Sequence, residues 1–245
     1  SWGKIYAVHL KPEGASYTAT KEEFVTGGPL PVTDAIIHPD GSMYFAIGGR
    51  RVQSGLYRVT YKGKESTAPV QSQPEKLPLH ELRRSIEAFH GKVDSKAIAT
   101  VWSHLSHQDR SIRSAARTAL EHQPVAQWKA KALTESNASA QLEALLALAR
   151  VEAAQKAPAT RDAIFLALLK HDYGKLSPEE RLAYARLVQI ILNRFGDPAQ
   201  GTLDLIAAKL DASYPADSFE ENWLLTETLA YLQHPDTAAK GMALI

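Results

Sequence analysis

The sequence predicts a mixed fold in which β-strands come first and α-helices follow: part of a β-propeller, then an α-solenoid of helical hairpins. Residues 29–61 hold three short β-rich runs separated by turn signals. Residues 62–78 are polar, contain three prolines and lack periodicity. From Leu79 onward apolar residues recur at helical spacing. We therefore expect an incomplete propeller portion over 1–62, a linker over 63–78 and a HEAT-like helical solenoid over 79–245.

Composition excludes several classes of function. The net charge of the 245 residues is +1, so no global field points to nucleic acid or to an anionic membrane. The absence of cysteine excludes disulfides, thiolate metal sites, a cysteine nucleophile and covalently attached haem within these residues. No apolar run is long enough to span a bilayer. Because the sequence opens Ser-Trp-Gly-Lys and enters a strand almost at once, we expect an excised product whose boundary cuts through a domain.

The β part is organised around the stretch Pro29–Tyr61. Asp40-Gly41 between two β-rich runs is a strong hairpin signal, because these residues accept the positive φ of a tight turn. We expect Pro12-Glu13-Gly14 to break the first strand, and Tyr17–Val25 is polar and mixed. The expected strands are Lys4–Leu10, Val32–Ile37, Ser42–Ile47 and Leu56–Tyr61. A propeller blade is not stable alone, so we expect its faces to be covered by the helical part, another subunit or other fragments of a parent protein.

The helical part is expected to consist of paired helices. Pairs begin near residues 81, 109, 138, 178 and 219, a spacing in the range of helical-hairpin solenoids. Pro178–Phe195 is expected to be the most buried helix, because its apolar residues surround it, and Ser177-Pro178-Glu179-Glu180 is a strong start signal. The expected helices are Glu81–His90, Ser95–His107, Asp109–His122, Val125–Leu133, Ala138–Ala153, Thr160–His171, Pro178–Phe195, Gln200–Ser213, Phe219–Gln233 and one beginning at Asp236.

One segment carries a more specific pattern. Residues 109–120 (DRSIRSAARTAL) resemble the HEAT repeat, with an aspartate before the helix, an arginine after an aliphatic residue, and then alanines and a leucine. The physical interpretation is that Asp109 caps one helix while an arginine ties it to the neighbouring repeat.

Candidate binding residues lie in the β part. Arg50 and Arg51 follow Gly48 and Gly49, and could present guanidinium groups to a cofactor or substrate, or else be solvated in a glycine loop. Asp34, at the start of a strand, could bind a cation or act as a base; a cap on local backbone amides is the alternative that we favour. Asp40 is explained by the turn, and Arg58 by a strand position in a contact between blades.

The helical part offers weaker candidates. His104 and His107 share a helical face, which a metal could use, although a solvated face explains them better. Asn137 begins a glycosylation sequon but also fits a helix N-cap. Net charge is +4 over residues 81–133 and −6 over residues 177–236, which suits either docking of different partners or solvated faces.

The chain resembles a known family. SWGKIYAVHLKPEGA, PLPVTDAIIHPDGSMYFAIGGR and QSGLYRVTY resemble the last part of the propeller in secreted "membrane-bound dehydrogenase" proteins of planctomycete and verrucomicrobial bacteria, related to the sorbosone and soluble glucose dehydrogenases. NASAQLEALLALARV and the segments RLVQIILNRFGDP and YPADSFEENWLLTETLAYLQHPD are similar to the helical region that follows such a propeller. Pro31 and Val32 stand where the sugar dehydrogenases often carry an arginine.

The resemblance implies a fragment of an exported, periplasmic or secreted, multidomain oxidoreductase-like protein. In the parent, the propeller would oxidise a sugar or alcohol with pyrroloquinoline quinone and pass electrons to a cytochrome c domain; neither that quinone nor a haem is expected within this chain. Its partners would be the remaining blades, that cytochrome domain and proteins bound by the helices. The alternative is a non-catalytic scaffold that binds protein or glycan. The fragment alone is expected to be inactive as a dehydrogenase.

Overall fold

The chain folds into antiparallel β-sheets followed by helices, as the sequence predicts at this coarse level. The computed structural model describes residues 3–49, 51–69, 77–153 and 157–244. Two compact units, residues 1–80 and 81–245, can be distinguished, and each is described here by itself. No described helix is long and apolar enough to cross a membrane.

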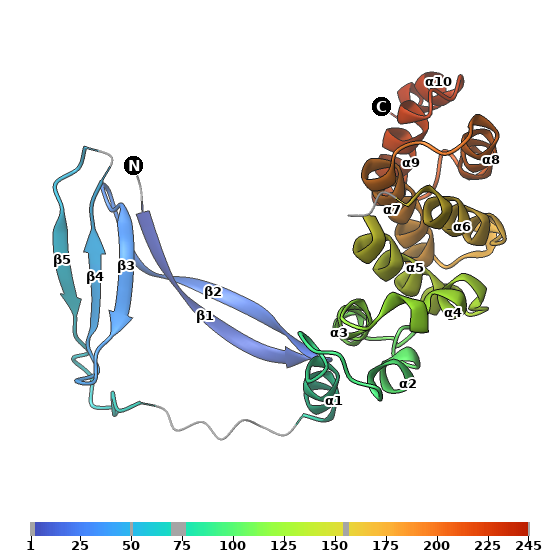
Figure 1. Ribbon diagram of the computed structural model, residues 1–245. Coiled ribbons are helices and arrows are strands. Elements are labelled where there is room, and N and C mark those ends of the chain that lie inside the picture. The colour runs from blue at the N-terminus through green and yellow to red at the C-terminus, as the bar shows by residue number, and fades with distance from the viewer. Residues whose placement is uncertain (1–2, 50, 70–76, 154–156, 245) are drawn as a thin grey trace. The chain divides into compact units, whose positions relative to one another are not determined.

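The first unit contains two antiparallel sheets (Figure 1). Strands β1 (Gly3–Glu13) and β2 (Ser16–Gly27) form a two-stranded hairpin. Strands β3 (Val32–Ile37), β4 (Met43–Ile47) and β5 (Gly55–Val59) form a three-stranded sheet in the order β3-β4-β5. The turn between β3 and β4 is the predicted one: the Asp40 carboxylate accepts a hydrogen bond from the Ser42 amide at 2.8 Å, and Gly41 has a φ of +80°.

The hairpin differs from the sequence prediction. Strand β1 continues through Pro12 to Glu13, and the residues predicted to be irregular and polar form β2, which pairs with β1 along its length. Nearly every residue of β2 is exposed or only half-buried, so the strand has no buried face to impose alternation on its sequence. Strand β5 also begins one residue earlier than predicted and ends at Val59.

The core of this unit is small. Leu30, Phe45 and Ile47 are buried together, and five half-buried residues pack around them: Ile5, Val25, Val32, Met43 and Val59. The cluster therefore joins the base of the hairpin to one face of the three-stranded sheet.

The second unit contains the helices. Most begin and end within a few residues of the predicted bounds. They are α1 (Pro78–Glu87), α2 (Ala97–Trp102), α3 (Arg110–Glu121), α4 (Lys129–Thr134), α5 (Ala138–Glu152), α6 (Pro158–Leu169), α7 (Pro178–Phe195), α8 (Gln200–Asp211), α9 (Phe219–Tyr231) and α10 (Thr237–Met242).

Two predicted helices are shorter in the structure. Helix α2 covers only the middle of the predicted Ser95–His107, and the predicted Val125–Leu133 is split into a 3₁₀ turn, Val125–Gln127, and α4. The split falls at Trp128, whose buried indole donates a hydrogen bond to the Gln123 carbonyl at 3.2 Å. That anchor holds Trp128 at φ −132°, outside the helical region, so α4 has to start afresh after it.

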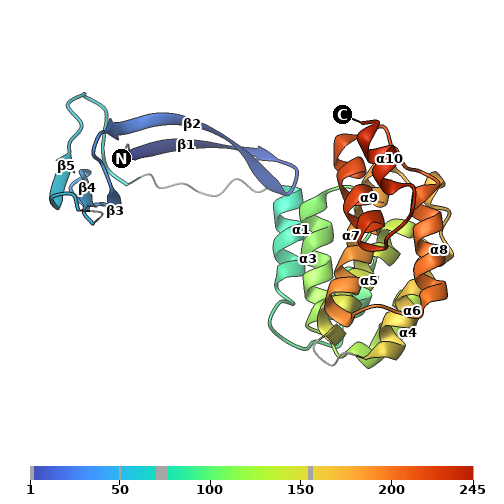
Figure 2. The same ribbon diagram turned by 90° about the horizontal axis from the view of Figure 1, so that it is seen from above.

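Consecutive odd-numbered helices pack against one another. Contacts run from α3 to α5, from α5 to α7 and from α7 to α9, while α4, α6 and α8 contact one another in the same order beside them. Figures 1 and 2 show these two rows from two directions. Helix α5, not α7, carries the larger number of buried residues, because α7 exposes one polar side along its whole length.

The helix starts follow the predicted signals. The Asp109 carboxylate accepts hydrogen bonds from the amides of Ser111 and Ile112, at 2.7 and 3.2 Å. The Asn137 side chain caps α5 by accepting from the Ala140 amide at 2.9 Å. At the start of α7, Ser177 and Glu180 form a reciprocal capping box.

Candidate functional site

The two residues proposed from sequence as cofactor contacts do not form a described site. Asp34 is exposed, and its carboxylate accepts a hydrogen bond from the Ala35 amide at 2.8 Å, beside an irregularity in the pairing of β3 with β4. This geometry is the local backbone cap that the sequence favoured for Asp34. Arg50 lies outside the described residues. Its neighbour Arg51 is exposed and has a φ of 62°, a conformation that non-glycine residues adopt mainly in turns.

Arg58 forms its contacts within its own sheet. Its guanidinium donates hydrogen bonds to the Asp40 carboxylate at 3.0 Å and to the Ser42 hydroxyl at 3.1 Å, and it lies 5.6 Å from the centre of the Tyr44 ring. The hydrogen bond that Asp40 accepts from the Ser42 amide is the main cause that lowers the pKa of its carboxyl. The ion pair of Arg58 with Asp40 therefore stabilises the β3–β4 turn. The contact between blades that was predicted for Arg58 is not among these interactions.

The three-stranded sheet exposes apolar side chains on both faces. One face, here called the outer face, carries Ile36, Tyr44, Ala46 and Leu56 between two charged residues, Asp34 and Arg58, because the strand register places all six on the same side. Ile36 is 57% exposed and Leu56 is 74% exposed. A shallow hollow of about 170 Å³ lies between them.

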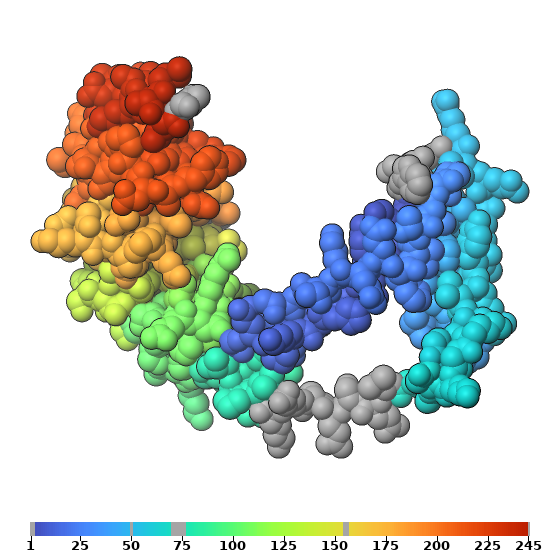
Figure 3. Space-filling view, turned by 180° about the vertical axis from the view of Figure 1, so that it is seen from behind, coloured from blue at the N-terminus to red at the C-terminus, as the bar shows by residue number. Residues whose placement is uncertain are grey.

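The opposite face is covered only in part. Phe45 is buried there beneath the stacked ring of Tyr57, but Ile37 on the same face is 73% exposed. The described residues of 1–80 therefore cover one face only in part and leave apolar side chains of the outer face exposed, whereas we expected both faces to be covered. The surface of the sheet runs from blue at β3 to cyan at β5 in Figure 3.

The β1–β2 hairpin also has an apolar side. The register places Tyr6, Val8, Leu10 and Tyr17 on one side of the ribbon, and all four are exposed. The other side is polar, with His9 facing Thr20. Lys21, opposite Val8, lies on the same side as Val8, and its ammonium sits 4.7 Å from the centre of the Tyr6 ring.

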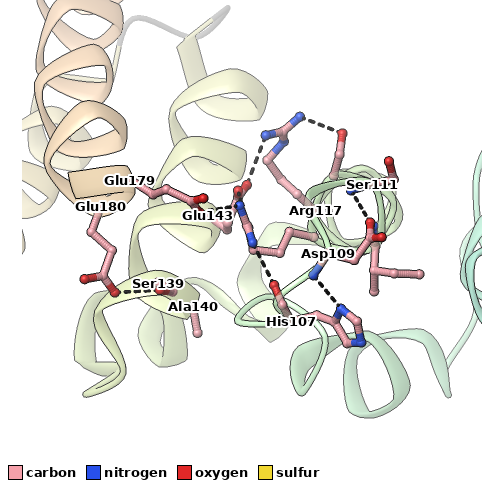
Figure 4. A network of polar contacts seen from close by, with 12 residues as sticks. His107, Asp109, Ser111, Arg117, Ser139, Ala140, Glu143, Glu179 and Glu180 are labelled. Carbon is pink, nitrogen blue, oxygen red and sulfur yellow. Dashed lines mark hydrogen bonds and ion pairs between the residues drawn. The ribbon is translucent and has the colours of Figure 1, made fainter. Parts of the chain in front are cut away.

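A second candidate surface is a network of ion pairs that crosses three helices (Figure 4). Glu143 of α5 lies between two arginines of α3: its carboxylate accepts a hydrogen bond from Arg117 at 3.0 Å and lies 3.8 Å from Arg113. Arg113 also contacts Glu179 of α7 at 3.3 Å. Arg113, the arginine that follows the aliphatic residue of segment 109–120, therefore contacts both α5 and α7.

Glu180 extends this network on α7. It accepts a hydrogen bond from the Ser139 hydroxyl of α5 at 2.6 Å, and it completes the capping box with Ser177. The Ser139 hydrogen bond, followed by those within the capping box, lowers the pKa of the Glu180 carboxyl. The network consists of ion pairs and helix caps that join α3, α5 and α7.

A third surface is a hollow of about 780 Å³ between α7 and α9. Arg186, Gln189, Ile190, Asn193 and Arg194 of α7 form one side of it. Thr228 and Tyr231 of α9 form the other, and Leu192 and Gly196 complete the lining. This volume falls within the range of ligand-binding pockets.

The floor of the hollow is held by Gln189. Its side-chain amide donates hydrogen bonds to the Leu224 carbonyl, the Thr228 hydroxyl and the Glu227 carboxylate of α9, at 3.1 to 3.3 Å. Sequence reasoning did not single out these residues, because the helix-to-helix contact that creates the hollow joins positions more than 30 residues apart.

Among the described residues, one group of three could hold a metal ion: Asp211, His234 and Asp236. The Lys240 ammonium lies 2.6 Å from the Asp211 carboxylate and already neutralises it. His104 and His107 are not part of such a group; the His107 ring accepts a hydrogen bond from the Asp109 amide at 2.9 Å. Burial, and then the nearby His107, lower the pKa of His104, which favours a neutral imidazole. His107 thus supports the start of α3, and the ring of His104 lies beside it, 6.2 Å away between ring centres.

The comparisons with known proteins identify no relative: the chain matches no protein-family model, no curated protein and no solved structure.

Proposed function

We propose that this chain is a binding scaffold whose β unit completes a larger β structure and whose helices bind protein partners. One observation carries the proposal: the three-stranded sheet exposes large apolar side chains, Ile36, Ile37 and Leu56, on both of its faces. Exposing them to water is costly, at about 25 cal/mol for each Å² of apolar surface, and a neighbouring sheet would remove that cost. The occupant of the outer face is accordingly an adjoining antiparallel sheet, as in a propeller.

The helical unit supports the scaffold function in a different way. Successive contacts among α3, α5, α7 and α9 are those expected of a HEAT-like solenoid, in which each hairpin contacts mainly its neighbours. The Asp109 cap and the ion pairs of Arg113 agree with the HEAT-like segment. Solenoids of this kind present extended surfaces that bind other proteins.

Dehydrogenase activity in a longer parent protein is a second hypothesis. It rests on the family resemblance, which also implies export, a quinone in the missing blades and a cytochrome c domain beyond this chain. The geometry of Asp34 favours the scaffold, because its carboxylate already serves its own backbone.

The proposal can be tested by cross-linking in the native source. Ile36 is replaced by the photoreactive residue benzoylphenylalanine, and the matched control carries it at Thr20, on the polar side of the hairpin. We expect cross-links from position 36, and not from position 20, to a segment that mass spectrometry identifies as β-rich sequence from outside residues 1–245. An intact native mass equal to that of this chain, with no cross-link from position 36, would refute the proposal.

The same native preparation separates the two functions. An absorption spectrum with haem or quinone bands in the cross-linked complex would support the dehydrogenase hypothesis. A complex that lacks both chromophores would support the non-catalytic scaffold.

A further inference from the structure

The hollow between α7 and α9 has an unusual charge for its place in the chain. Residues 177–236 contain ten acidic and four basic residues. Two of those four basic residues, Arg186 and Arg194, line the hollow, and no carboxylate is among its lining residues. Neither arginine forms an ion pair with the described residues; Arg186 donates a hydrogen bond only to the neutral Gln189 side chain, at 2.8 Å.

Two carboxylates bonded to residues at the hollow have neutral hydrogen-bond donors as partners. Asp197 accepts a hydrogen bond from the Tyr231 hydroxyl at 2.9 Å, and the Arg161 guanidinium binds the Asp197 carbonyl at 2.7 Å. Glu227 accepts from the Trp223 indole at 2.5 Å and from Gln189. Two exposed guanidinium groups therefore flank a hollow in which no described carboxylate forms an ion pair with them.

Helix geometry fixes the distance between the two arginines. Eight residues separate Arg186 from Arg194, so their backbone positions are about 12 Å apart along the helix axis. Ile190 lies midway between them, lines the same hollow and is half-buried. Along the side of α7 that faces the hollow, two cationic side chains, Arg186 and Arg194, therefore flank the apolar side chain of Ile190.

An extended peptide has a matching spacing. Residues i and i+4 of a strand lie about 13 Å apart and point to the same side, with residue i+2 between them. Acidic residues at i and i+4 would meet Arg186 and Arg194, and an apolar residue at i+2 would meet Ile190. The exposed Tyr231 ring on the α9 side adds an aromatic contact of the kind that is enriched at binding hot spots.

We propose that the α7–α9 hollow binds an extended acidic segment of a partner protein, with an acidic residue, any residue, an apolar residue, any residue and a second acidic residue in sequence. This inference deepens the proposed scaffold function, since it specifies one partner of the helical unit. The bidentate geometry of guanidinium with carboxylate gives the site its preference for carboxylates.

Fluorescence anisotropy with synthetic peptides tests the proposal on the full chain. The probe is labelled Gly-Ser-Glu-Ser-Leu-Ser-Glu-Ser-Gly. A second peptide carries glutamine in place of both glutamates, and a third has its two glutamates three residues apart, so that they point to opposite sides of a strand. We expect saturable binding of the first peptide and at least about tenfold weaker binding of the other two, because the glutamine peptide loses both charge-assisted pairs and the third peptide loses one.

Protein variants locate the site. We expect Arg186→Gln and Arg194→Gln together to weaken binding of the first peptide about tenfold or more. The control, Arg84→Gln, changes an exposed arginine of α1 and should leave binding unchanged. Circular dichroism should show that all these variants keep the helical content of the parent chain, since the substituted side chains are exposed.

Two results would overturn the proposal. One is equal affinity for the glutamate peptide and the glutamine peptide; the other is equal loss of binding in the Arg84 control and the hollow variants. Both results bear only on the α7–α9 hollow. The sheet cross-linking experiment would still stand or fall on its own, so failure here is distinguishable from failure of the proposed scaffold function.

Discussion

Removal of Arg181 should destabilise the helical unit strongly. Arg181 of α7 donates hydrogen bonds to both carboxylate oxygens of Glu221 on α9, at 2.9 and 3.1 Å, and its guanidinium also binds the Leu176 carbonyl at 3.2 Å. The Glu221 side chain is only 2% exposed. The Tyr173 hydroxyl donates a further hydrogen bond to it at 3.1 Å. Burial and this carboxylate raise the pKa of Tyr173, so its hydroxyl remains a donor.

The magnitude follows from what each variant leaves behind. Arg181→Met keeps the side-chain bulk but leaves the buried Glu221 carboxylate with one neutral donor, the Tyr173 hydroxyl. Removing one partner of a buried ion pair costs roughly 3–5 kcal/mol. In Arg181→Met with Glu221→Leu no charge is buried. The Tyr173 hydroxyl loses its shorter hydrogen bond and keeps only the backbone carbonyl of residue 181, at 3.4 Å, so a residual cost of about 1 kcal/mol is expected. The double variant should therefore be more stable than the Arg181→Met single variant.

Urea unfolding monitored by circular dichroism at 222 nm measures this effect, since that signal reports the helices. The wild-type chain, the two single variants and the double variant form a double-mutant cycle. We expect a coupling energy of about 2 kcal/mol or more between the two positions. A cost below about 0.5 kcal/mol for Arg181→Met, or additive single variants, would show that the pair does not hold α7 to α9 as the geometry indicates.

Three further outcomes are expected. Asp109→Ala should lower the free energy of unfolding by about 1–2 kcal/mol through loss of the α3 cap, while Asp109→Ser should retain most of it in the same urea assay. The pKa of Glu180 is lower in the folded than in the unfolded chain. Its stabilising contribution is therefore fully present above the unfolded carboxyl pKa and is lost as pH falls through the folded pKa. NMR titration should show that Ser139→Ala raises the folded pKa of Glu180, and the dependence of stability on acid pH should become smaller. The isolated chain should not reduce redox dyes with sugars or alcohols, and sustained sugar-dependent turnover by the pure chain would contradict that prediction.

Local signals explain which parts of the fold the sequence predicts well. Strand β3 and helix α7 have the predicted bounds, Val32–Ile37 and Pro178–Phe195. Both are delimited by residues whose backbone demands are strong. The Asp-Gly turn follows β3, and α7 lies between its capping box and Gly196, which has a φ of +79°. Where the boundary chemistry is encoded within a few residues, sequence reasoning finds it.

Tertiary anchors explain most of what was missed. Strand β2 escaped notice because its residues are mostly exposed, and alternation is a signature of burial on one face. The break between the 3₁₀ turn and α4 depends on where the Trp128 indole finds its acceptor, which propensity does not register. Helix α5 is more buried than α7 because helices pack on several of its sides, a property of the assembled unit.

The candidate surfaces were predictable only in part. An interhelical contact was expected of an arginine in the segment 109–120, and Arg113 contacts Glu143 of α5 and Glu179 of α7. The α7–α9 hollow was not predicted, although the spacing of Arg186, Ile190 and Arg194 is visible in the sequence. The sequence does not reveal that Tyr231 of α9 lies across the hollow from these three residues, or that its hydroxyl donates a hydrogen bond to Asp197.

The β1–β2 hairpin has a consequence for hydrogen exchange. Each of its strands pairs with only one partner, so about every second backbone amide points away from the ladder and exchanges with solvent. Protection along β1 and β2 in the isolated chain should therefore alternate residue by residue. If another strand pairs with either edge, the open positions of that strand become protected while the other strand keeps its alternation. The pattern of amide protection along β1 and β2 would therefore show, residue by residue, which edge of the hairpin pairs with another strand.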